Sequence, residues 1–151
     1  MDNTFTYIIR SSNKEVTSDN TSSCTIHLSG LPSQYKYFDC TVSALHVSTI
    51  SGVFTTSTFE LRADTLDIIN GKDSTGGQLK TIGMASYNNT YPQGPFTFIC
   101  GNFNGRSVRF TLCDETGAQL TSNFNGGGVA SYNKPWLLVL NMVGVPNDNY
   151  N

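Results

Sequence analysis

The sequence predicts an all-β protein, a single antiparallel jelly-roll β-sandwich of about eight strands. The chain contains 16 Ser, 18 Thr and 15 Asn, whereas the helix-forming residues Ala and Glu number only 5 and 3. Hydrophobic and polar residues alternate with a period of two in segment after segment. Clusters of Gly, Pro, Asn and Ser separate these segments, as expected for short strands joined by many turns.

Alternation defines the strands expected in the first part of the chain. Residues 4–10, 23–28 and 58–63 each place aromatic or aliphatic side chains on one face and polar side chains on the other. Residues 37–49 form the longest expected strand. Its hydrophobic positions change parity near Ala44, so we expect a β-bulge or bend at that point.

Five further strands are expected in the rest of the chain. Residues 66–69 form a short continuation that ends in a strong turn signal, and residues 78–87 alternate weakly. Residues 96–100 and 107–113 alternate clearly. Residues 136–145 are apolar on both faces, so this segment should be a central strand or one covered by a partner.

This number of strands fits one domain spanning residues 1–151. A jelly roll agrees best with eight strands at this length, and an immunoglobulin-like sandwich is the nearest alternative. Residues 1–3 and 146–151 are candidates for flexible termini. The first residues lack the basic and apolar regions of a secretion signal, and no apolar stretch is long enough to span a bilayer. We therefore expect synthesis in the cytoplasm and no transmembrane segment.

Charge and cysteine content restrict the possible ligands. Only 13% of residues are charged, the formal net charge is -2, and the basic residues are scattered, so direct nucleic-acid binding is not expected. The two histidines, His27 and His46, lie on different expected strands, and no cysteine pair has metal-ligand spacing, so no metal is expected. Free thiols acting as small hydrophobic side chains are the favoured interpretation, and disulfides are the main alternative. The cysteines are Cys24, Cys40, Cys100 and Cys113.

No motif indicates catalysis, so we expect neither an enzyme nor a cofactor. A small hydrolase has no nucleophile motif to support it. A glycosidase needs two carboxylates that face one cleft, which spacing alone does not exclude. Asp64, Asp67, Asp114 and Glu115 lie near strand ends or in turns, where carboxylates usually cap backbone amides.

Tyrosines in the expected loops and the C-terminal segment are the candidate interface residues. Loop tyrosines can stack on sugars, anchor a protein interface or simply pack within their own loops. The polar C-terminal segment is a candidate for an arm that pairs with a neighbour. The candidates are Tyr87, Tyr91, Tyr132 and Tyr150.

The order of these segments resembles the single jelly-roll minor capsid and penton proteins of large icosahedral DNA viruses. In this family, a turn with Asp and Gly precedes a final apolar strand, and residues 114–117 followed by residues 136–140 are similar to that pattern. The resemblance covers nearly the whole chain but rests on strands and turns rather than an invariant motif. The segments that carry it are residues 5–12, 24–28, 35–38, 106–112, 114–117 and 136–140.

Membership of this family would imply a structural role in a virion. The partners would be the major capsid protein and other minor capsid proteins, with a homo-oligomer such as a pentamer as one option, and assembly would take place in the host cytoplasm. The family has no catalytic residues to transfer. The alternative is a carbohydrate-binding jelly-roll module that uses loop tyrosines and Trp136. Because Trp136 begins an apolar strand, we expect it in the core, which weakens that alternative.

Overall fold

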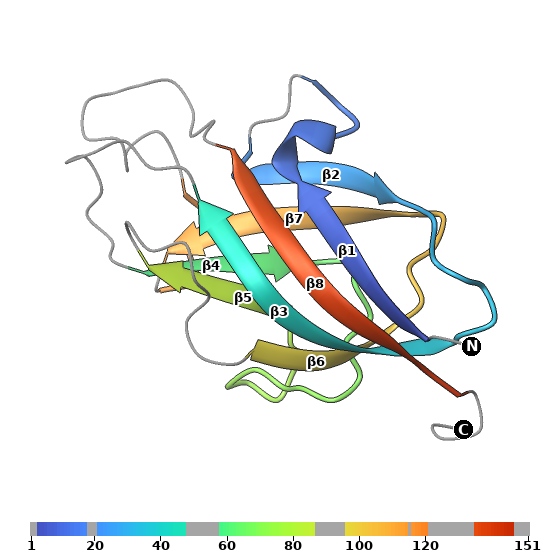
Figure 1. Cartoon of the computed structure of the whole chain (residues 1–151). Coiled ribbons are helices and arrows are strands. Elements are labelled where there is room, and N and C mark those ends of the chain that lie inside the picture. Colours follow the sequence, from blue (N-terminus) through green and yellow to red (C-terminus); the bar gives the residue numbers. More distant parts are fainter. Residues whose placement is uncertain are drawn as a thin grey trace.

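Eight strands form two antiparallel four-stranded sheets that pack face to face as a β-sandwich (Figure 1). The computed structural model describes residues 3–17, 21–47, 58–86, 96–114, 116–120 and 135–146. Within these residues no helix has the length and hydropathy needed to cross a membrane. The elements are β1 (Thr4–Arg10), the 3-10 turn η1 (Ser11–Asn13), β2 (Ser23–Leu28), β3 (Tyr37–Val47), β4 (Thr58–Ala63), β5 (Thr81–Ser86), β6 (Phe96–Gly101), β7 (Arg106–Asp114) and β8 (Trp136–Val145).

The strands pair in a nested order. One sheet has the order β1-β8-β3-β6 and the other β2-β7-β4-β5, so the first strand pairs with the last and the fourth with the fifth. The prediction of an all-β sandwich of about eight strands is confirmed. A jelly roll requires nested pairing of this kind, because its chain pairs like one long hairpin that is wound around the core.

Several local predictions are also confirmed. The pairing of β3 with β8 shifts register between Val42 and Ala44, where the parity change predicted a bulge. β8 lies between β1 and β3, as expected for a strand that is apolar on both faces.

The strand expected at residues 66–69 is wrong, and the start of the strand expected at residues 78–87 also differs. Ile68 forms only an isolated bridge with Cys100, because this segment crosses from the β4 sheet to the free edge of β6. The strand expected from residue 78 begins at Thr81, because Lys72 and Gln78 close a separate turn. The strand expected to reach residue 49 is described only as far as Val47.

The core fills the space between the two sheets. Most strands contribute alternate side chains to it, in agreement with the period-two alternation of the sequence. β5 is an exception, because its register shift brings both Ile82 and Ala85 into the core. All four cysteines are buried. Cys24, Cys40 and Cys100 belong to the core, whereas Cys113 lies beside Glu60 of β4 and is not part of the core cluster. The largest fully buried side chains are Phe38, Phe59, Phe98, Phe103, Phe110, Ile26, Leu45, Leu61, Ile68, Ile82 and Leu112.

Candidate functional site

The outer face of the β1-β8-β3-β6 sheet carries an exposed cluster of apolar side chains. In one row across three strands, Ile8 of β1 lies beside Val139 of β8, and Val139 lies beside Ala44 of β3. In the next row Leu137 lies between Arg10 and His46. We define Ile8, Ala44, Leu137 and Val139 as the apolar patch.

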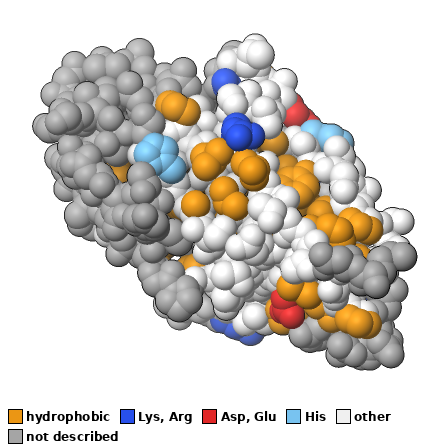
Figure 2. Space-filling view, in the orientation of Figure 1, with side chains coloured by type: hydrophobic (Ala, Val, Ile, Leu, Met, Phe, Trp, Pro, Cys, Tyr) orange, Lys and Arg blue, Asp and Glu red, His pale blue; other side chains and the backbone are white. Residues whose placement is uncertain are grey.

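The apolar patch is partly open to solvent and continues into a shallow pocket. Ile8 is 44% exposed, and the other three side chains are half-buried. Figure 2 shows hydrophobic side chains gathered over this sheet, with a basic side chain at one margin. The pocket, of about 280 Å³, is lined by Arg10, Ser11, Ser12, His46, Pro135, Trp136 and Leu137. This end of the face therefore offers apolar surface bordered by Arg10 and His46.

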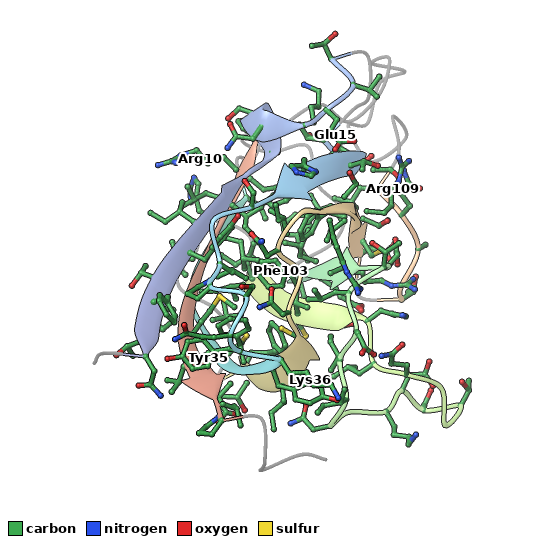
Figure 3. The ribbon with its side chains drawn as sticks, turned by 90° about the vertical axis from the view of Figure 1, so that its right-hand side faces the viewer. Arg10, Glu15, Tyr35, Lys36, Phe103 and Arg109 are labelled. Atoms are coloured by element: carbon green, nitrogen blue, oxygen red, sulfur yellow. The ribbon has the colours of Figure 1, made fainter. Side chains whose placement is uncertain are left out.

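The opposite outer face, on the β2-β7-β4-β5 sheet, is polar and internally hydrogen-bonded. The Arg109 guanidinium donates to the hydroxyl oxygens of Ser23 at 2.5 Å and Thr25 at 3.3 Å (Figure 3). Asp64 accepts a hydrogen bond from Thr111 Oγ1 at 2.5 Å and lies 3.3 Å from Arg62. Because these side chains already bind one another, this face has fewer groups available to a partner than its content of polar residues suggests.

Trp136 belongs to the core, as the sequence predicts. Its side chain is 2% exposed and its ring centroid lies 5.4 Å from that of Phe110. The indole Nε1–H donates to the Thr21 carbonyl at 2.7 Å, and the Trp136 backbone N–H donates to the Ser11 hydroxyl at 2.9 Å. The ring therefore fixes β8 to the chain between η1 and β2 and cannot present its face to a sugar.

A concavity of about 560 Å³ lies at the other end of the sandwich. Figure 3 shows Tyr35 and Lys36 at this end, away from Arg10 and Glu15. The Asn102 side-chain amide donates to the Pro32 and Tyr35 carbonyls, so it positions the surrounding loop. The lining residues are Ser33, Tyr35, Lys36, Tyr37, Asp67, Gly101, Asn102, Asn104 and Arg106. Its size and mixture of aromatic and polar groups would suit a small polar ligand.

Two turns share a motif that the sequence analysis did not recognise. In Asp73-Ser74-Thr75-Gly76 the Asp73 carboxylate accepts hydrogen bonds from the backbone N–H and hydroxyl of Thr75 and from the Gly77 N–H. Gly76 has φ +84°, a conformation that glycine adopts without strain. The repeated pattern Asp-x-Thr-Gly is the signal that would have identified both turns.

The second turn reproduces these interactions at Asp114. Its carboxylate accepts from the N–H and hydroxyl of Thr116 and from the Ala118 N–H, and Gly117 has φ +86°. The Thr116 hydroxyl contributes most to a lowered Asp114 pKa. The prediction that carboxylates cap backbone amides is therefore right for Asp114. Asp67 instead accepts a hydrogen bond from the Gln78 side chain.

Two of the cysteines lie close together in the core. Cys40 Sγ and Cys100 Sγ are 3.6 Å apart on the paired strands β3 and β6. Their hydrogen bond and their burial raise the pKa of the Cys40 thiol. Burial, followed by the nearby Glu60 carboxylate, raises the pKa of Cys113 to about 11. These groups are poor nucleophiles because the thiolate is the reactive form.

The two histidines lie on different strands, β2 and β3, as the sequence predicts, and both are exposed. The His27 side chain is 51% exposed with its Nδ1 3.7 Å from Glu15, and His46 is exposed on β3. Among the described residues, no group of three or more His, Cys, Asp or Glu side chains could hold a metal ion.

The four candidate interface tyrosines, Tyr87, Tyr91, Tyr132 and Tyr150, lie outside the described residues. Glu115 also lies outside them.

Comparisons with known proteins do not add an identification. No protein-family model, curated protein or solved structure matches this chain. The assignment of function therefore depends on the geometry of the fold and of its two outer faces.

Proposed function

We propose that this chain is a structural protein of a virus particle, a minor capsid or penton component of an icosahedral DNA virus. In this role it contacts neighbouring capsid proteins and catalyses no reaction. The nested strand pairing supports a jelly-roll fold for the sandwich, and the resemblance of the strand order to capsid proteins supports the class. Fold alone does not determine function, so a feature of the surface has to carry the proposal.

The apolar patch is the observation that carries the proposal. It occupies the outer face of a sheet whose inner face already packs on the core, so its hydrophobic character has no role in that core. Apolar side chains contiguous across three strands are typical of a surface that a partner covers. On the opposite outer face, polar side chains form hydrogen bonds with one another. This difference favours the outer face of the β1-β8-β3-β6 sheet as the surface that contacts neighbouring proteins.

The direct test is mass spectrometry and cryo-electron microscopy of purified particles from cells that express the chain. We expect the protein at a fixed copy number and at a defined symmetry position. A matched pair of variants then tests the patch. Val139→Lys places a charge in the patch and should reduce incorporation at least tenfold, whereas His27→Lys on the polar sheet should incorporate normally. Absence from particles, or equal incorporation of both variants, would refute the proposal.

A carbohydrate-binding module is the second candidate, supported by the concavity beside Tyr35. Tyr37 and Lys36 line it, and the Lys36 ammonium lies 5.4 Å from the centroid of the Tyr37 ring. A glycan array separates the two candidates. Binding to a defined sugar that is lost in Arg106→Ala, together with absence from particles, would establish the module.

A further inference from the structure

The chain covers two edges of its sheets with its own backbone. Beside β2, the Glu15 N–H donates to the Thr25 carbonyl at 2.8 Å. Beside β6, the Gly101 N–H donates to the Asp67 carbonyl, also at 2.8 Å. An edge covered in this way has no free row of donors and acceptors for another strand.

The two remaining edges differ in regularity. β5 has six residues, and its pairing with β4 shifts register between Leu61 and Arg62. An irregularity of this kind disfavours the pairing of another strand with the edge. β1 has seven residues and pairs with β8 without any register shift. It contains no Pro or Gly and one charged residue, Arg10. β1 therefore lacks the features by which proteins usually protect an open edge.

The register identifies which backbone groups of β1 are open. The Gly144 N–H donates to the Asn3 carbonyl at 2.8 Å, so in this antiparallel ladder the alternate residues Phe5, Tyr7 and Ile9 exchange hydrogen bonds with β8. The N–H and C=O groups of Thr6 and Ile8 point the other way.

Those groups have no backbone partner among the described residues. Figure 1 shows β1 as the right-hand edge of the front sheet. The open groups therefore lie along one regular side of the sandwich.

We propose that a second copy of this chain adds its own β1 to this edge, antiparallel and related by a two-fold axis. With the axis at Tyr7, Thr6 of each copy lies opposite Ile8 of the other, so the open donors and acceptors match in number and direction. Thr4 then faces Arg10, which places the two guanidinium groups at opposite ends of the interface. The two four-stranded sheets become one continuous sheet of eight strands.

A second copy is the favoured occupant because one contact closes both edges. Each copy contributes the same regular strand, in which Arg10 is the one charged residue. Dimers related by a two-fold axis are the commonest homo-oligomers, and their interface pairs the same surface of both copies. The interface also covers Ile8, which is 44% exposed in the single chain. This inference does not depend on a role in a capsid, since it concerns the purified chain alone.

Sedimentation of the purified protein over a concentration series tests the dimer, and a proline tests the edge. Thr6→Pro removes an outward N–H and leaves the hydrogen bonds to β8 in place, because Pro is tolerated on edge strands. We expect the wild type to dimerise and Thr6→Pro to raise the dissociation constant about tenfold or more. The matched control Thr6→Val keeps the N–H and should dimerise normally. Circular dichroism checks that each variant is folded.

Hydrogen exchange provides a second test that needs no variant. The amides of Thr6 and Ile8 should exchange rapidly in dilute protein and slowly at concentrations where the dimer forms. The amides of Tyr7 and Ile9 should exchange slowly in both, because β8 holds them. A protein that stays monomeric at all concentrations overturns the proposal. A dimer in which the amides of Thr6 and Ile8 gain no protection from exchange also overturns the proposal. This test uses the wild-type protein, so it remains valid if Thr6→Pro does not fold.

Discussion

Replacement of Trp136 by Phe tests whether this side chain is a structural anchor. The change removes the indole N–H that donates to the Thr21 carbonyl at 2.7 Å, and it removes part of a ring that is 2% exposed. A buried hydrogen bond contributes about 0.5–1.5 kcal/mol, and the lost ring atoms contribute about 1–2 kcal/mol more. We therefore expect Trp136→Phe to lower the free energy of unfolding by about 2–3 kcal/mol.

Denaturant unfolding followed by far-UV circular dichroism measures this change, since the variant lacks the chain's single tryptophan as a fluorescent probe. For a domain of this size the melting temperature should fall by about 4–12 °C. Val143→Thr is the control, because Val143 lies on the same strand but is 38% exposed, and its effect should stay within about 0.5 kcal/mol. A loss below about 0.5 kcal/mol for Trp136→Phe would refute the anchoring role and reopen Trp136 as a binding platform.

Three further predictions concern packing, pH and thiols. Gly144→Ala should destabilise the protein by about 1–3 kcal/mol in the same unfolding assay, because an added Cβ would lie 2.6 Å from the Tyr35 ring; an unchanged midpoint would contradict the packing. Because the folded-state pKa of Asp114 is lowered, its stabilising contribution is present above the unfolded pKa of about 3.9 and is lost as the pH falls through the folded value. Asp114→Asn should therefore weaken the dependence of the urea midpoint on pH in this acidic range, and an unaltered dependence would argue against the turn. A thiol reagent should label four cysteines in unfolded, unreduced protein. It should react slowly with native protein, because the thiols are buried and the pKa of Cys113 is raised to about 11. Rapid labelling of the native protein would contradict the burial of the thiols.

Alternation predicted most of the fold because one face of every strand packs on the core. The segments around β1, β2, β4 and β8 were placed within a residue of their observed bounds, and the bulge near Ala44 was visible as a change of parity. The prediction of a strand at residues 66–69 was wrong because an extended connection between the two sheets can bury alternate side chains, as a strand does. Ile68 is buried in this way but forms only an isolated bridge.

The sequence predicted only part of the apolar patch: it showed that residues 136–145 are apolar on both faces, but not which side chains of other strands lie beside them. Ile8 and Val139 are neighbours only because β1 pairs with β8 in one particular register, and a shift by one residue would turn these side chains to the other face. Long-range pairing of this kind is set by the packing of the whole sandwich. The candidate tyrosines stay a prediction, because they lie outside the described residues, whereas the apolar patch is made of residues within strands.

The two proposals concern adjacent parts of one face and have a joint consequence. Ile8 belongs both to the apolar patch and to the open edge of β1. In a dimer centred on Tyr7, the two copies of Ile8 lie diagonally across the axis, so the two patches join on the same side of one continuous sheet. A neighbouring capsid protein would then meet a larger apolar surface than either chain offers alone. If both proposals are correct, Thr6→Pro should reduce incorporation into particles even though Thr6 is not part of the patch, and Val139→Lys should reduce incorporation without changing the monomer–dimer equilibrium. Loss of dimerisation in Val139→Lys would instead show that the central strand forms part of the dimer contact, and the edge-pairing geometry would be wrong.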